Sequence, residues 1–497
     1  MKTHNKTQYR SVLKSSSLIG GSAFINIFIQ MIKTKVIAVL LGPTGVGLMN
    51  MYTVLSTTGS TIAGLGLQSS GVRSISGAIG ENDSLRVAKI SKTIAITLWF
   101  TGIAVCILTI ALSPIISQQT FGNSQHVNPI RILSLSILFA NLLVGKTCLL
   151  QGHRRIADIA KQSILGAISG TVISIPCIYL LGESGIAISL LLTSISLFTG
   201  GVWFSRKIIM AETRISIPEF KSELKSLLSF GLPVMGVAFQ GALMAYFLRL
   251  IILNKFDMAG VGIWSAAFAI SGVLTNFVLN AMGTDYYPRL AAISNNYAKV
   301  SNEVNTQLEI ALLLAVPALV ITVLFAPYAI ELLYSGKFDQ AVPILRWSVY
   351  GILGRVISWP LSFIMPAQGR GVIFFFTDLF ANISHLTLLY FCGIFFGLQG
   401  TGIAFMINYI IYIVLMIFVA KKIAKTYISR RNAKMIFLSI ITLLVSSFAH
   451  YYIANAVLFY ITGFIFAILV SYICAKRLSI LTGVKMSDVK MKLFNKR

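Results

Sequence analysis

The chain has 497 residues, of which 56% are hydrophobic and 11% are charged, and its mean hydropathy is +0.82. A typical globular domain has about 25% charged residues, so this composition excludes a soluble globular protein and indicates a membrane protein. The 41 Lys and Arg residues exceed the 15 Asp and Glu residues and give a net charge of +26. In a soluble chain that excess would indicate nucleic-acid binding. In a membrane chain its meaning depends on where the basic residues lie.

Long apolar segments follow one another through the chain, each near the roughly 20 residues that cross a bilayer as a helix. They are too long for the alternating ~10-residue strands of a membrane barrel. The sequence therefore predicts an all-α polytopic membrane protein with about 14 transmembrane helices. The predicted spans are 16–41, 46–72, 93–113, 128–150, 162–181, 185–204, 228–253, 260–283, 307–329, 342–365, 372–396, 401–420, 435–453 and 457–475.

The basic residues give the orientation, because cytoplasmic loops retain an excess of Lys and Arg. With both termini in the cytoplasm, 32 of the 41 basic residues lie on the cytoplasmic side, and only Lys255 and Lys337 lie in outer loops. Most of the charge thus reflects topology, and no nucleic-acid partner is expected. The other seven lie within spans. Three of these, Arg131, Lys146 and Arg346, are within about 6 Å of a span end and can extend to the interface.

The sequence repeats itself weakly at an offset near 215 residues. GVG occurs at 45–47 and again at 260–262, and Arg73 corresponds to Arg289. Short matches of this kind keep the same order along both halves, which indicates a duplication.

The duplication predicts two parallel six-helix lobes, related by an axis along the membrane normal, with two C-terminal helices appended. In secondary transporters built this way the substrate lies between the repeats. A duplicated bundle need not transport anything, but fourteen spans without a large extramembrane domain favour transport. The predicted domains are the N-lobe (1–204), a cytoplasmic linker (205–227), the C-lobe (228–420), spans 13 and 14 (421–475) and a basic cytoplasmic tail (476–497).

Four basic residues lie at membrane depth, where an ionisable group is costly and indicates function. Arg355 is the deepest, about 15 Å from the inner end of its span, and Lys33 lies about 12 Å from the outer end of span 1. Arg249 lies only about 6 Å from the outer end of span 7, and it is a candidate because it is the counterpart of Lys33 in the repeat. Lys35 points to another side of the helix than Lys33, so only one of the two can face a cavity centrally. These four are the candidate substrate-binding residues of a cationic cavity.

Asp378 is the only acid well inside a predicted span. Its depth differs from that of Arg355 by about 6 Å, a distance that a guanidinium stem can bridge. A structural ion pair and an ion-coupling role both remain open for it. His385, two turns further along, could titrate near neutrality or be a hydrogen-bonded interior histidine.

Asn26 and Gln30 lie on the same helical face as Lys33 and are candidate polar cavity-lining residues. Hydrogen bonding between helices would explain them equally well. Residues 382–384, NIS, form a glycosylation sequon, but inside span 11 it predicts no glycan.

No enzymatic constellation emerges from the sequence. Residues 140–147, ANLLVGKT, match a loose phosphate-binding loop, but they lie within an apolar helix whose N–H groups are already used. The five cysteines show neither metal-binding nor disulfide spacing. We therefore expect no catalytic residue, no metal and no cofactor.

Three segments carry a resemblance to a known family: KTKVIAVLLGPTGVGLMNMY (33–52), LRLIILNKFDMAGVGIWSAAFAI (248–270) with TDYYPRLAAISNN (284–296), and LLQGHRRIADIAKQSILG (149–166). The chain resembles the polysaccharide-export branch of the multidrug/oligosaccharidyl-lipid/polysaccharide (MOP) exporter superfamily. Within it, the chain is similar to bacterial O-antigen translocases, which flip undecaprenyl-diphosphate-linked oligosaccharides.

The resemblance implies a MATE-like MOP fold in the bacterial inner membrane and a role in O-antigen or other surface polysaccharide biosynthesis. It implies alternating access, with the sugar-diphosphate head in a central cavity and the polyprenyl tail in lipid. It also implies that Lys33 faces this cavity. Leu248 stands where many relatives have an acid, so an ion-coupling role does not transfer to that position. The implied partners are the lipid-linked oligosaccharide, membrane lipid, H⁺ or Na⁺, and polymerase or glycosyltransferase proteins.

Two other functions are open at this stage. A cation-coupled multidrug exporter of the same fold would need a carboxylate in its cavity, and spans 1–10 have none deep inside. A non-transporting membrane partner of a polysaccharide synthase would leave the deep cations without a purpose. The sequence favours the flippase.

Overall fold

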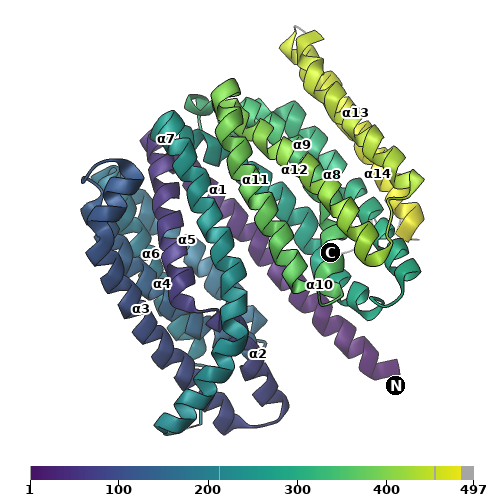
Figure 1. Ribbon diagram of the computed structural model, residues 1–497. Coiled ribbons are helices and arrows are strands. Elements are labelled where there is room, and N and C mark those ends of the chain that lie inside the picture. The colour runs from purple at the N-terminus through teal and green to yellow at the C-terminus, as the bar shows by residue number, and fades with distance from the viewer. Residues whose placement is uncertain (1, 212, 453–454, 483–497) are drawn as a thin grey trace, which may run out of the picture. The chain divides into compact units, whose positions relative to one another are not determined.

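The computed structural model describes residues 2–211, 213–452 and 455–482, and all regular structure within these ranges is helical (Figure 1). The prediction of an all-α fold is confirmed. Most of the predicted basic tail, from residue 483 onward, lies outside the described residues.

The chain divides into two compact units, Met1–Gly262 and Ile263–Arg497. This boundary falls inside the helix Ile217–Ala292, which belongs to the second sequence repeat. It differs from the lobe boundaries inferred from the repeat, and those boundaries stay a prediction. The first unit contains α1 (Lys2–Gly64), α2 (Leu67–Gly80), α3 (Ser84–Phe121), α4 (Val127–Gly152), α5 (Ile156–Leu181), α6 (Ser184–Ser205) and the first part of α7 (Ile217–Ala292).

The second unit begins with the remainder of α7. It continues with α8 (Tyr297–Leu333), η1 (Gly336–Phe338), α9 (Ala341–Ser362), α10 (Ile364–Ala367), α11 (Gly371–Phe396), η2 (Gly397–Gln399), α12 (Gly400–Ala424), α13 (Arg430–Tyr452) and α14 (Ala456–Thr482).

Eleven helical stretches among the described residues are long and apolar enough to cross a membrane. Three of them are far longer than one crossing requires. They are Ile25–Gly64, Ile217–Val273 and Gly371–Ala424, with 40, 57 and 54 residues. Each of these three overlaps two of the spans predicted from the sequence.

Two of the long helices are broken at equivalent positions of the repeat. In α1 the break is at Gly42, with φ 65° and ψ −165°. In α7 it is at Asp257, with φ 64° and ψ −172°. The two residues are 215 positions apart, which is the offset of the sequence repeat. The same backbone break in both copies gives the weak sequence duplication a structural counterpart.

The break in α7 is unusual because a residue with a side chain occupies it. Positive φ costs little at glycine but strains most other residues, with Asp and Asn among the better tolerated. The Asp257 carboxylate compensates by accepting a hydrogen bond from the Gly260 backbone N–H at 2.9 Å, as an N-cap for the helix that follows.

The helices that follow these breaks meet through the GVG tripeptides. A Cβ on Gly47 would overlap the carbonyl oxygen of Met258 and lie 2.9 Å from the Gly262 nitrogen. A Cβ on Gly262 would overlap the carbonyl oxygen of Pro43 and lie 3.0 Å from the Gly47 nitrogen. Only glycine permits this approach of two backbones, and the contact is reciprocal in the numbering of the repeat.

Side-chain caps mark the starts of α3, α7 and α8. Asp83 accepts a hydrogen bond from the Arg86 N–H at the start of α3, and Asn296 accepts one from the Lys299 N–H at the start of α8. At the start of α7, the Glu219 carboxylate accepts hydrogen bonds from both the backbone N–H and the hydroxyl of Ser216. These caps satisfy N–H groups that a helix leaves without partners.

Candidate functional site

Lys33 lies in the first part of α1 and is buried, with 7% of its surface exposed. A Cβ added to Gly170 of α5 would lie 4.0 Å from the Lys33 Nζ, so the ammonium group points toward α5. Within the described part of the chain, no hydrogen bond or ion pair reaches this ammonium group. A buried cation without a countercharge is costly, which makes Lys33 the most unusual of the predicted site residues.

The predicted polar residues on α1 differ in their surroundings, because some pack against α5 and others are exposed. Asn26, two turns before Lys33, donates a hydrogen bond to the Ser163 hydroxyl of α5 at 2.7 Å. Gln30 is exposed, and Lys35 is half-buried on another side of the helix. Asn26 and Lys33 thus face the same neighbouring helix.

Arg249 lies on α7, in the first compact unit, and is half-buried. Its Nη1 donates a hydrogen bond to the Ala245 carbonyl at 2.9 Å, one turn back along the helix. The guanidinium group therefore folds along its own helix.

Arg355 lies on α9, in the second unit, and its exposure differs from that of its neighbours. Gly354, Val356 and Ile357 are buried, whereas Arg355 is exposed. Its side chain therefore points away from the packed core of the unit. A guanidinium group held outside the core at this depth can contact a ligand.

Asp378 on α11 is half-buried and lies close enough to Arg355 for the two charges to interact. Its Oδ2 accepts a hydrogen bond from the Asn382 amide at 3.1 Å. Tyr409 and Tyr412 on α12 interact electrostatically with both charges, and their rings are 6.1 Å apart. We call these five residues the α9–α11–α12 polar cluster.

Three members of this cluster were missed at the sequence level. Asn382 was noted only as part of a sequon, and Tyr409 and Tyr412 looked like ordinary aromatic residues of an apolar span. Polar residues one turn from the single deep acid, on its own helix, were a usable signal for Asn382. The tyrosines gave none, because their place depends on how α12 packs against α9 and α11.

His385 is not part of this polar cluster. Its ring centroid lies 5.6 Å from that of Phe405, and its Nε2 has no hydrogen-bond partner in the described residues. The sequence left a hydrogen-bonded interior histidine open, whereas the observed surroundings of the ring are aromatic.

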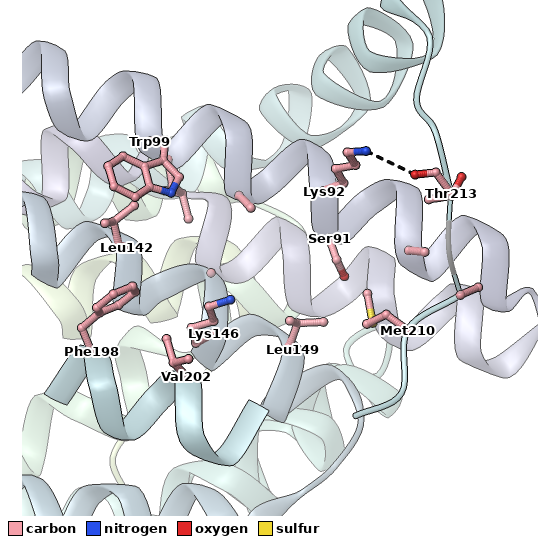
Figure 2. A pocket seen from close by; sticks show the side chains of 15 residues that line it. Ser91, Lys92, Trp99, Leu142, Lys146, Leu149, Phe198, Val202, Met210 and Thr213 are labelled. Carbon is pink, nitrogen blue, oxygen red and sulfur yellow. Dashed lines mark hydrogen bonds between the residues drawn. The ribbon is translucent and has the colours of Figure 1, made fainter. Parts of the chain in front are cut away.

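A separate pocket of about 380 Å³ lies in the first unit, between α3, α4, α6 and the segment that follows α6 (Figure 2). Lys146 and Lys92 line it, and Lys92 donates a hydrogen bond to the Thr213 carbonyl at 3.2 Å. Trp99 and Phe198 form part of its apolar lining. Residues 140–147 are helical within α4, so the GKT match is not a phosphate-binding loop.

The fold is that of known membrane transporters. A structure described as an inward-facing multidrug resistance MATE family transporter of the MOP superfamily aligns with a TM-score of 0.69 and 16% identity, covering 81% of this chain and 96% of that one. A structure of the lipid II flippase MurJ in an inward closed conformation aligns with a TM-score of 0.70 and 16% identity, covering 94% and 99%. The chain is therefore a multi-pass membrane protein with the MOP superfamily fold.

The sequence comparison gives the family. Residues 36–343 match the polysaccharide biosynthesis protein family, and the chain belongs to that family. It is 24% identical over 411 residues to the lipid III flippases of Escherichia coli (strain K12) and Shigella flexneri, covering 81% of this chain and 96% of theirs. The resemblance predicted from sequence is confirmed at the level of the family and of the fold.

Proposed function

We propose that this protein is a flippase that moves an undecaprenyl-diphosphate-linked oligosaccharide, an O-antigen or other surface polysaccharide repeat unit, from the cytoplasmic to the outer leaflet. The observation that carries the proposal is the buried ammonium group of Lys33, which has no hydrogen-bond or ion-pair partner among the described residues. Its desolvation cost is offset when an anionic group binds. Family membership and the lipid III flippase relatives support a lipid-linked sugar as the source of that anion.

The substrate chemistry fits the basic residues. A diphosphate carries negative charge that Arg355 and Arg249 can bind through bidentate hydrogen bonds, for which guanidinium is better suited than ammonium. Tyr409 and Tyr412 add hydroxyl groups and ring faces suited to a sugar. Asn26 and Gln30 are the polar lining residues on α1, and Lys35 supplies a further cation near the same helix.

The proposed mechanism is alternating access by two lobes. Fourteen spans, six in each lobe and two appended, place both termini in the cytoplasm. The head group occupies a cationic cavity between the lobes while the polyprenyl tail stays in lipid. We place the protein in the bacterial inner membrane, where polymerase and glycosyltransferase proteins would supply and consume its substrate.

Asp378 is proposed as the ion-coupling group, for H⁺ or Na⁺. It is half-buried, and its charge interacts with that of Arg355. Its Oδ2 accepts a hydrogen bond from the Asn382 amide. Protonation or cation binding at this carboxylate would free Arg355 to bind the diphosphate, which links ion and substrate. His385 is a second titratable group on the same helix, two turns away.

Proteoliposome transport of a labelled lipid-linked oligosaccharide, under defined ion gradients, tests the proposal. Lys33→Ala and Arg355→Ala should each reduce the flipping rate about 10- to 100-fold, since a hydrogen bond to a charged group contributes about 1.5–3 kcal/mol. Lys422→Ala, at an exposed position at the end of α12, is the matched control. Undiminished flipping in both variants would exclude the cationic site, and export of a cationic dye instead would indicate a drug exporter.

A further inference from the structure

A groove of about 680 Å³ opens between α8, α13 and α14. Both α13 and α14 (yellow in Figure 1) pack against α8 and make little contact with each other, and residues of all three helices line the groove. The groove lies wholly within the second unit and contains none of the predicted site residues.

One end of the groove is strongly basic. Arg430, Arg431 and Lys434 line it from the first turns of α13, and Arg477 lines it from α14. No acidic residue occupies the first turn of α13. According to the positive-inside rule this end faces the cytoplasm.

A single buried carboxylate neutralises part of this charge. Glu309 of α8 has 6% of its surface exposed and forms ion pairs with Arg431 and with Arg477, the latter at 3.3 Å. It thereby fastens both C-terminal helices to α8. Arg430 and Lys434 have no acidic partner among the described residues, so the basic end keeps an excess of positive charge.

The rest of the groove is apolar. Leu312 and Val316 of α8, Met435 and Leu438 of α13, and Val470 of α14 line it beyond the basic end. The lining of α13 runs from residue 430 to residue 442, which is about 18 Å of helix. One leaflet of a bilayer with a hydrocarbon thickness of ~30 Å has a similar depth.

We propose that this groove binds an anionic glycerophospholipid of the inner leaflet, with its phosphate on Arg430 and Lys434 and an acyl chain along the apolar lining. Basic pockets between transmembrane helices on the cytoplasmic side suit such headgroups. The charge excess selects an anionic lipid over a zwitterionic one, and the one-leaflet depth selects a membrane lipid over a free phosphate. The site does not depend on the transported substrate.

The test uses the full-length protein in an uncharged detergent, with dioleoyl phosphatidylglycerol or dioleoyl phosphatidylcholine added at equal ratios. Native mass spectrometry and the thermal midpoint should show more bound phosphatidylglycerol and a larger stabilisation by it. The double variant Arg430→Gln/Lys434→Gln should lose at least half of this preference and keep its fold, because the Glu309 ion pairs are untouched. The control Lys422→Gln/Lys476→Gln removes the same charge outside the groove and should keep the full preference.

A second readout is the alkylation of Cys474, which lines the groove, in a Cys177→Ser background. Phosphatidylglycerol should slow this reaction more than phosphatidylcholine does. The proposal fails if both lipids act alike, if the control loses as much preference as the groove variant, or if inorganic phosphate reproduces the effect. It also fails if undecaprenyl phosphate displaces phosphatidylglycerol, because the groove would then hold the polyprenyl chain.

Discussion

Lys33 is the residue at which the proposed binding role conflicts most directly with stability. Lys33 is buried without a countercharge in the described chain, and such a group weakens the fold unless a ligand neutralises it. Functional sites often show this conflict, since a residue suited to binding is seldom the one that packs best.

Replacing Lys33 with Met should therefore stabilise the protein while reducing flipping about 10- to 100-fold, as expected for Lys33→Ala. Methionine fills a similar volume without a charge, so we expect the free energy of unfolding to rise by about 1 kcal/mol or more. The thermal midpoint in detergent and the proteoliposome flipping rate measure the two effects. A loss of stability would show that the ammonium group has a structural role.

Asp378→Asn separates ion coupling from a structural ion pair. Asparagine keeps an oxygen for the Asn382 amide, and Arg355 is exposed, so the free energy of unfolding should change by less than about 1 kcal/mol. Flipping driven by an ion gradient should be lost. If flipping persists and the protein is clearly destabilised instead, the pair is structural.

His126 should make the stability depend on pH. It lies in the connection between α3 and α4, where its Nδ1 is 2.8 Å from the Tyr52 hydroxyl and its ring stacks on Phe121 at 3.9 Å. Burial lowers the pKa of His126 below the ordinary value of 6.5. The folded state thus favours the neutral ring, and stability that is present above pH 6.5 is lost as the pH falls below it, by at most about 1.4 kcal/mol per pH unit.

His126→Gln keeps a hydrogen-bonding side chain and removes the titration. Thermal midpoints measured between pH 5 and pH 8 should show a shallower dependence in this variant than in the unmodified protein. Equal slopes would mean that other groups account for the acid sensitivity.

At the scale of the helices, the GVG contact brings two backbones close together. A clash there would be with backbone atoms, so a change of side-chain rotamer cannot remove it. Gly47→Ala and Gly262→Ala should each destabilise the protein by a few kcal/mol, since overpacking typically costs about 1–3 kcal/mol. The double variant should cost less than the sum of the two, because one separation of the helices relieves both clashes. Gly77→Ala in α2, where a Cβ meets nothing within 4 Å, is the control and should be neutral or stabilising.

Hydropathy predicted the existence of the helices well, because apolar runs of span length have few alternatives in a membrane. It predicted their ends poorly. The segment 228–253 is only part of α7, which begins at Ile217, where the Ser216 and Glu219 cap permits an earlier start. Helix depth also predicted that Arg355 and Asp378 lie at similar levels, because the rise per residue is fixed; an ion pair between them stays a prediction.

Packing between helices could not be predicted in the same way. That Lys33 points toward Gly170, and that Tyr409 and Tyr412 join the α9–α11–α12 polar cluster, depends on the rotation of each helix about its axis. One sequence constrains this rotation weakly in a membrane, because lipid and protein interior are equally apolar.

At the scale of the whole molecule, the proposed topology can be tested by labelling. In a Cys177→Ser/Cys474→Ser background, a membrane-impermeant maleimide should modify Lys337→Cys from the periplasmic side and Lys299→Cys only after the membrane is opened. Both positions are exposed. Modification of both from the same side would contradict the predicted fourteen spans.

The reciprocal glycine contact also bears on how such a chain arose. When residue i of one copy meets residue j of the other, and j meets i, the pattern is that of an isologous twofold dimer. Pro43 and Gly47 meet Gly262 and Met258 in this manner, although all four belong to one polypeptide. The contact therefore has the pattern that a homodimer interface would leave after gene duplication and fusion, and substitutions should be least tolerated where backbone touches backbone.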